Sequence, residues 1–406
     1  MTEPFSASFS ASFSVPFSVP FAASGAEIHL GGSVDERPAL PCDPDRLEEA
    51  ARGVLADRPF WYVAGGAGSG ATLRANRAAF DGYGLVPRMS RDNTVRDWST
   101  TVLGTAMPAP VLLAPIGVQS ILHPDGELAV ARAAAELGVT MVLSTAASYT
   151  TEEVAAASGE GPRWYQLYWA NDDTVTISLL RRAEAAGFTV LVVTLDTWLL
   201  GWRPRDLDDA YLPFLRGVGA AIPFSDPAFR AGLARSPEDD LMAAVRHRQR
   251  MFQGNAKHWD RLDLIREHWD GPVVLKGIQH VDDALRAVDV GMDAVIVSNH
   301  GGRQIDRAIG SLWTLPGIVG AVDGRAAVLF DSGIRTGADA AVALALGADA
   351  VLLGRPYAYG LALGGQDGVR HVVRTVLAEL DITLAQAGYT DLAQLRATRD
   401  AISTLG

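Results

Sequence analysis

The chain has 406 residues, of which 48% are hydrophobic and 20% are charged, as in an ordinary globular protein. Its formal net charge of -12 argues against nucleic acid as the main partner, because phosphate backbones attract basic surfaces. A single cysteine, Cys42, excludes an internal disulfide and any metal site built from several cysteines. No apolar run approaches the roughly eighteen residues of a membrane span. We therefore expect a cytoplasmic protein with no nucleic acid, membrane or metal partner.

The first residues form a degenerate four-residue repeat, in which Phe-Ser-Ala-Ser and Phe-Ser-Val-Pro each occur more than once. The repeat contains Glu3 and lacks the basic residues and continuous apolar core of a secretory signal. We expect residues 1–40 to form a low-complexity, disordered tail, with a misassigned start as the alternative. Residues 41–406 are then expected to form one folded domain.

An N-terminal helical segment is predicted to begin at Asp43 and Pro44, because aspartate caps free N–H groups and proline suits a first turn. A glycine-rich stretch follows, in which Gly66, Gly68 and Ala71 have the spacing of a dinucleotide fingerprint. No β-branched strand precedes it, and no acidic residue ends a second strand at the required distance. We therefore interpret this stretch as a mobile connection.

Short apolar runs alternate with amphipathic stretches from residue 111 onward. The eight runs are residues 111–114, 139–143, 164–167, 190–193, 273–275, 294–297, 327–330 and 350–353. The stretches expected to be helical are residues 126–137, 151–157, 174–186, 281–288 and 338–346. Eight strands that alternate with helices predict an α/β protein with a (β/α)₈ TIM barrel. A doubly wound sheet is the alternative that this pattern leaves open.

The connection between the fourth and fifth apolar runs is much longer than a usual loop. It contains tryptophan, tyrosine, phenylalanine and many charged residues. Connections of this length are usually functional or disordered. We expect residues 204–262 to form a lid loop after strand four, on the barrel face where sites are built.

Polar residues and glycines follow the predicted strands, whose carboxyl ends meet at one face of a barrel. Residues 298–304, Ser-Asn-His-Gly-Gly-Arg-Gln, combine a possible base with a carboxylate-binding arginine, which suits chemistry on a small acid. Glycines and arginines after strands seven and eight predict a phosphate site, and the earlier polar groups suit a flat heteroaromatic ring. Individually, Lys276 could be a surface lysine, Asp331 a helix cap, and Tyr62 or Tyr168 a core aromatic.

From about Asp43 to the C-terminus, the chain resembles the FMN-dependent L-2-hydroxy acid oxidases and dehydrogenases. The resemblance rests on residues 298–304 and on the motifs at 114–117, 165–168, 195–197, 275–277 and 331–335. Within the family, residues 201–207, 275–280 and 354–358 are most similar to the lactate 2-monooxygenase branch.

The resemblance implies FMN as cofactor, with a small (S)-2-hydroxy acid and oxygen as substrates. It implies that His300 removes the substrate proton and that Asp196 stabilises the imidazolium that forms. Tyr168 would bond the substrate hydroxyl. Lys276 would lie near flavin N1 and O2, where negative charge develops on reduction.

Binding residues are implied in the same way. The substrate carboxylate would be held by Arg303 and Tyr62, with Arg203 as a second cation. The residues implied around the flavin ring are Pro115, Ile116, Gly117, Ser144, Gln166, Thr194 and Ser298. The residues implied along the ribityl phosphate are Asp331, Gly333, Arg335, Gly354 and Arg355.

Two positions depart from the family pattern. Ala146 stands where relatives often carry a bulky side chain over the substrate, so a larger or aromatic acid could fit. Gly117 replaces an alanine that several oxidases have beside flavin N5. The alternatives are therefore a mandelate-type oxidase or dehydrogenase and, outside catalysis, an idle phosphate-binding barrel. Release or oxidative decarboxylation of the keto acid stays open, and the resemblance implies a tetramer or octamer.

Overall fold

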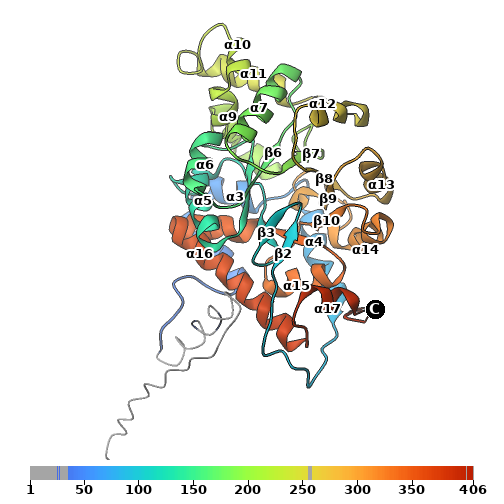
Figure 1. Cartoon of the computed structure of the whole chain (residues 1–406). Coiled ribbons are helices and arrows are strands. Elements are labelled where there is room, and N and C mark those ends of the chain that lie inside the picture. The colour runs from blue at the N-terminus through green and yellow to red at the C-terminus, as the bar shows by residue number, and fades with distance from the viewer. Residues whose placement is uncertain (1–24, 26, 28–34, 255–257, 399, 406) are drawn as a thin grey trace, which may run out of the picture.

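The computed structural model describes residues 25, 27, 35–254, 258–398 and 400–405. Its centre is a closed barrel of eight parallel strands (Figure 1). The strands are β4 (Val111–Leu113), β5 (Thr140–Ser144), β6 (Arg163–Leu167), β7 (Leu191–Thr194), β8 (Val273–Ile278), β9 (Ala294–Val297), β10 (Ala327–Phe330) and β11 (Ala350–Leu353). All eight expected strands are confirmed, and pairing of β11 with β4 closes the sheet and excludes the doubly wound alternative.

Alternating side chains along each strand build two apolar layers, because successive residues of a strand point to opposite faces. Leu112, Val142, Trp164, Val274 and Ile296 belong to one buried cluster. Their chain neighbours belong to a second and larger cluster, which also contains residues of the surrounding helices. Both faces of every strand are buried, and this explains why the strands read as continuous apolar runs.

Helices surround the barrel and follow its strands along the chain (Figure 1). They are α5 (Gly126–Leu137), α6 (Thr151–Ser158), α7 (Asp173–Ala185), α13 (Val281–Asp289), α14 (Ser311–Val322), α15 (Gly337–Ala345), α16 (Arg355–Gln386) and α17 (Leu392–Ala397). The expected helices are confirmed, with boundaries shifted by at most one residue. Local sequence sets these boundaries: Thr150 and Glu153 form a reciprocal capping box at the start of α6. None of the described helices has the length and hydropathy of a membrane span.

The N-terminal segment is helical, as expected. It contains α2 (Pro44–Val54), α3 (Asp57–Ala64), α4 (Ala71–Ala78) and η2 (Phe80–Gly82). Asp43 caps α2 by accepting a hydrogen bond from the Arg46 amide at 2.9 Å. The glycine-rich stretch between α3 and α4 is tied to the loop after β9, because Ala67 N donates to Gly302 O and Ser69 N to Asp306. Most of the predicted tail, residues 1–40, lies outside the described residues.

A small hairpin closes the amino end of the barrel. It consists of β2 (Thr100–Val102) and β3 (Thr105–Met107), and Val102 and Met107 join the inner barrel cluster. The Trp164 indole N–H donates to Thr105 Oγ1 at 2.9 Å. A second pair of short strands, β1 (Tyr83–Leu85) and β12 (Ile402–Thr404), joins two distant parts of the chain. The hairpin leaves the carboxyl ends of the strands as the open face.

The predicted lid is inserted between β7 and β8, after the fourth strand of the barrel, but it is mainly helical. Its elements are short helices and 3₁₀ turns: α8 (Pro204–Asp208), η4 (Pro213–Arg216), α9 (Ala221–Ser225), α10 (Pro227–Ala231), α11 (Leu241–Phe252), η5 (Trp259–Arg261) and α12 (Leu262–Glu267). Outside the lid, the described residues also form the short 3₁₀ turns η3 (Gln119–Ile121) and η6 (His300–Gly302). Helices α9, α10 and α11 lie together beside α7 (Figure 1). The insertion is thus a small helical layer.

Candidate active site

A cavity of about 180 Å³ opens at the carboxyl ends of the barrel strands. It brings together most of the residues predicted from the sequence: Tyr62, Pro115, Ile116, Gly117, Ala146, Tyr168, Arg203, Lys276, His300, Arg303, Asp331, Gly333, Arg335, Gly354 and Arg355. The other predicted residues, Ser144, Gln166, Thr194, Asp196 and Ser298, lie behind this lining, on the barrel strands or just after them.

The loop after β9 holds His300 in an unusual backbone conformation. His300, Gly301 and Gly302 have φ angles of 58°, 63° and 75°, in the left-handed region that glycine adopts without strain. The His300 amide donates to Ser298 Oγ at 3.0 Å, and the Gly301 amide donates to Ser332 Oγ at 3.0 Å. These bonds fix a non-glycine residue in a costly conformation, as is common where a side chain must be aimed.

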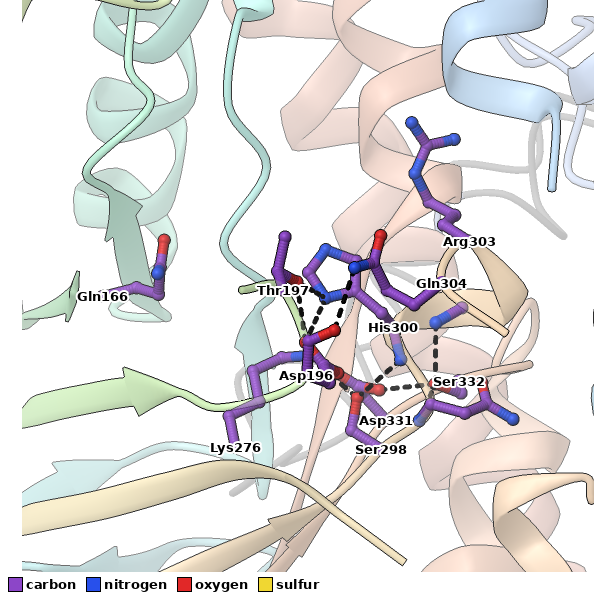
Figure 2. Close-up of polar contacts among 12 residues, drawn as sticks. Gln166, Asp196, Thr197, Lys276, Ser298, His300, Arg303, Gln304, Asp331 and Ser332 are labelled. Carbon is purple, nitrogen blue, oxygen red and sulfur yellow. Dashed lines mark hydrogen bonds and ion pairs between the residues drawn. The ribbon is translucent and has the colours of Figure 1, made fainter. Parts of the chain in front are cut away.

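His300 and Asp196 form the central polar pair of the site (Figure 2). His300 Nδ1 lies 2.8 Å from Asp196 Oδ1, and Thr197 Oγ1 donates to the same carboxylate oxygen at 2.8 Å. Burial lowers the pKa of His300, and Asp196 only partly opposes this effect. Burial would raise the pKa of Asp196, but His300 and Lys276 hold it at about 2. A neutral imidazole therefore donates from Nδ1 to an ionised carboxylate, which leaves Nε2 free to accept a proton.

Lys276 is a buried cation at the end of β8. Its Nζ lies 2.9 Å from Asp331 Oδ2 and donates to Ser298 Oγ at 2.8 Å (Figure 2). Although burial alone would lower it, Asp331 and Asp196 raise the pKa of Lys276. Ser332 Oγ in turn donates to Asp331 Oδ1 at 2.6 Å. The lysine is therefore a fixed positive charge next to the His300–Asp196 pair.

The inner wall fits a flat ring with acceptor atoms. Gln166 Oε1 accepts from Ser144 Oγ at 2.9 Å, while the buried Gln166 Nε2 has no partner among the described residues. A ring carbonyl would satisfy this donor. At Gly117, an added Cβ would lie 2.7 Å from Ala146 O, so glycine is required where the loops after β4 and β5 approach each other. An isoalloxazine ring carries such a carbonyl, and Gln166, Ser144 and Gly117 would hold it.

Buried Glu127 joins the two loops that form this wall. Its Oε1 accepts from the Gln119 amide at 3.1 Å and from the Ser148 amide at 3.0 Å. Burial raises the pKa of Glu127, although these amides oppose the rise. Because the two bonds connect the loops after β4 and β5, Glu127 sets the distance between Gly117 and Ala146.

Cations line the side of the cavity that faces the base. The Arg303 guanidinium packs over the Tyr62 ring at 5.2 Å and donates to Gly65 O at 3.0 Å. Burial lowers the pKa of Arg303 to about 10, so it stays charged near neutral pH. Arg203 donates to Gln304 Oε1 at 3.0 Å and pairs with Asp206 at 3.7 Å. Burial raises the pKa of the Tyr168 hydroxyl, which keeps it protonated as a donor.

The loops after β10 and β11 form the predicted phosphate end of the cavity. Burial lowers the pKa of Arg335, whose guanidinium has one acceptor among the described residues, Ile334 O, at 3.0 Å from Nη1. Arg355 has more partners: it donates to Val63 O, Gly65 O and Gly301 O at 2.9, 2.9 and 3.1 Å. Arg335 is therefore the freer of the two cations, and Arg355 also ties α3 to the loop of His300.

Several cavity residues were not predicted from the sequence. Ser332 belongs to the 331–335 motif but had no role predicted from its sequence, and in the structure it supports the His300 loop. Phe214, Arg248 and Phe252 reach the cavity from the lid. Nothing in the sequence separates Arg248 from Arg246 and Arg250 on the same helix.

The geometry defines a flavin-type oxidoreductase site on a TIM barrel, with a base, a fixed cation and arginines at one strand-end face. Comparisons identify the family: residues 51–403 match the FMN-dependent dehydrogenase family, and the chain belongs to it. An FMN-dependent alpha-hydroxy acid dehydrogenase of Penicillium citrinum is 48% identical over 90% of this chain and 92% of its own. An L-lactate oxidase of Lysinibacillus sphaericus is 41% identical over 91% and 95%. A crystal structure of mandelate oxidase has a TM-score of 0.79 and 40% identity, covering 90% of this chain and 98% of that one.

Proposed function

We propose that this chain oxidises an (S)-2-hydroxy acid to the 2-keto acid, with oxygen as the electron acceptor. The observation that carries the proposal is the His300–Asp196 pair, which adjoins a cavity that also holds Arg303 and Tyr168. A base beside a buried cation is the arrangement needed to take a proton from a small hydroxy acid held by its carboxylate.

The chain's own residues account for the proton and the charges. When bound, FMN supplies the acceptor for the electron pair that leaves C2 of the substrate and transfers it to oxygen. His300 holds the substrate hydroxyl proton at Nε2, because Nδ1 is engaged with Asp196. Asp196 stabilises the imidazolium. Lys276 provides a preformed positive charge, which needs no rearrangement during the reaction.

Substrate orientation follows from the cations and tyrosines. Arg303 and Tyr62 bind the carboxylate, with Arg203 as the second cation, and Tyr168 donates to the hydroxyl oxygen. Arginine suits this role because its planar fork matches both oxygens of a carboxylate. The substrate side chain then points toward Ala146 and the lid, where the small methyl group of Ala146 leaves room.

The lid favours the lactate 2-monooxygenase-like outcome, in which the keto acid stays bound and is decarboxylated. Phe214 and Phe252 from the lid line the cavity, and a lid that must open slows product release. The reaction of (S)-lactate in air separates the two outcomes. An oxidase forms pyruvate and hydrogen peroxide, each equal to the oxygen consumed. The monooxygenase reaction forms acetate, carbon dioxide and water. Absence of oxygen consumption with every 2-hydroxy acid would contradict the proposal.

A mandelate-type reaction is the second candidate, and Ala146 favours it. The relative of known structure with 40% identity is named a mandelate oxidase. Comparing kcat/KM for (S)-mandelate and (S)-lactate tests this candidate.

The homo-oligomer and the cytoplasmic location stay predictions. Light scattering of the purified protein would measure the oligomeric state.

A further inference from the structure

Arg248 is a buried cation that reaches the cavity from the lid. It lies on α11, which also carries Arg246 and Arg250. Arg246 and Arg250 are exposed, whereas Arg248 is only 8% exposed and lines the cavity together with Tyr62 and Arg303. The lid therefore contributes one arginine to the site and leaves its neighbours in solvent.

No hydrogen bond or ion pair engages the Arg248 guanidinium within the described part of the chain, and its buried Nε has no acceptor. It packs instead over the rings of Phe214 at 4.5 Å and Phe252 at 5.8 Å. The other arginines of the cavity all donate to oxygen atoms: Arg203, Arg303, Arg335 and Arg355. Buried donors without acceptors cost free energy unless a ligand satisfies them.

The ion pairs of the cavity also indicate that Arg248 needs an anionic partner. Two other cavity cations are paired with carboxylates of the chain: Lys276 with Asp331, and Arg203 with Asp206. A substrate carboxylate would compensate Arg303. Neither Asp331, Asp206 nor the substrate carboxylate then compensates the charge of Arg248. Burial lowers its pKa to about 10, so it is still charged at neutral pH.

Arg248 and Arg303 pack over different aromatic rings of the cavity. Arg303 packs over Tyr62 at 5.2 Å, the rings of Tyr62 and Phe214 are 6.4 Å apart, and Arg248 packs over Phe214. Two aromatic rings thus stand between the two arginines in this series of contacts. Because Arg248 packs over the lid rings of Phe214 and Phe252 and Arg303 packs over Tyr62, the two arginines are candidates for binding separate carboxylates.

We propose that Arg248 binds a second carboxylate at the far end of the substrate side chain, so that the preferred substrates are 2-hydroxy dicarboxylic acids. This inference rests on the proposed oxidation of a 2-hydroxy acid at the same site. The first carboxylate occupies Arg303 and Tyr62, the hydroxyl faces His300, and the side chain passes Ala146 toward the lid. An apolar side chain would cover the guanidinium without providing an acceptor, whereas a carboxylate matches its planar donors.

The test compares substrates of equal chain length that differ only in the second carboxylate. These are (S)-2-hydroxyglutarate against (S)-2-hydroxypentanoate, and (S)-malate against (S)-2-hydroxybutanoate, with the FMN-loaded protein. We expect one dicarboxylate at least to have the higher kcat/KM of its pair. Arg248→Met should reduce this preference by about 30-fold or more, because it leaves a carboxylate in a buried site without its cation. Arg246→Met, on the exposed face of α11, is the matched control and should keep the preference.

Binding provides a second readout that does not depend on turnover. The Kd of 2-oxoglutarate, measured from its effect on the visible spectrum, should rise in Arg248→Met by a similar factor, and that of 2-oxopentanoate should not. Preference for the monocarboxylate in both pairs would overturn the inference while leaving the proposed function intact. An equal loss for both members of a pair in Arg248→Met would reduce Arg248 to a structural role. If no 2-hydroxy acid of either kind reduces the flavin, the proposed function fails and the inference fails with it.

Discussion

His300 Nδ1 lies 2.8 Å from Asp196 Oδ1, although the two residues are 104 positions apart in the chain. The barrel produces this contact, because β7 and β9 both end at the same face and flank β8. The contact determines which imidazole nitrogen carries the proton, and so which nitrogen is available as the base.

Replacing the base tests its role directly. His300→Gln keeps a polar side chain of similar size but removes the group proposed to accept the substrate proton. General-base catalysis contributes about 10²- to 10⁴-fold, so kcat should fall by at least about 100-fold. Rapid mixing under anaerobic conditions measures the rate of flavin reduction, and the FMN content of the variant controls for loss of cofactor. Unchanged turnover would remove His300 from the mechanism.

The pH dependence follows from the direction of the His300 shift. The base must be neutral, and burial lowers the pKa of His300 below its ordinary value of 6.5. Activity should therefore be fully present at neutral pH and should be lost as the pH falls through this lowered pKa. Asp196, with a pKa of about 2, stays ionised throughout. The measurement is kcat/KM against pH, and an acidic limb centred above pH 7 would disagree with a buried neutral imidazole.

Asp196→Asn should change both the height and the position of that profile. The maximal kcat should drop by about 100-fold or more, because the amide neither stabilises the imidazolium nor selects the reactive tautomer. The acidic limb should move to lower pH, because Asp196 is the group that raises the pKa of His300 against burial. A variant with lower kcat and an unmoved limb would indicate that Asp196 acts only on structure.

Gly117→Ala tests the close approach of the loops after β4 and β5, which border the cavity. The added Cβ would lie 2.7 Å from Ala146 O and 2.8 Å from Ala146 Cβ, so the backbone of one loop must move. Such overpacking costs about 1–3 kcal/mol. We expect weaker FMN binding and a lower Tm of the loaded protein. Gly53→Ala is the control, since nothing lies within 4 Å of a Cβ there, and it should leave FMN binding intact.

Asp381 is predicted to matter for stability and not for chemistry. Both of its oxygens are bonded to Arg96, at 2.7 and 2.8 Å, and the buried Trp98 indole donates to it at 2.7 Å. Asp381→Ala would leave these donors unpaired and should lower the free energy of unfolding by about 3–5 kcal/mol. Asp367→Ala removes only an exposed pair with Arg370 and should cost less than about 1 kcal/mol. Denaturant unfolding measures both, and equal effects would contradict this account.

The barrel could be predicted because its strands are buried on both faces and appear as separate apolar runs. These apolar runs also predicted most of the site, because the residues that follow each strand of a barrel meet at one face. Asp196 and His300 are examples, each placed just beyond a strand.

The lid could not be predicted in the same way. Its length and composition predicted a loop, but Pro204, Pro213 and Pro227 occupy the first turns of short helices, where a missing N–H costs nothing. Arg248 faces the cavity because of how α11 packs, and its immediate sequence contains two other arginines with the opposite exposure. The hairpin of β2 and β3 has strands of three residues, too short for a periodic pattern.

The central claim is that this site oxidises a 2-hydroxy acid at bound FMN. It is tested most directly by the visible spectrum of the purified protein under anaerobic conditions, before and after (S)-lactate, (S)-mandelate and (S)-2-hydroxyglutarate. We predict a yellow protein whose flavin absorbance is bleached by at least one of these acids and restored by air. A colourless protein that binds no added FMN, or a yellow protein that none of the acids bleaches, would contradict the account.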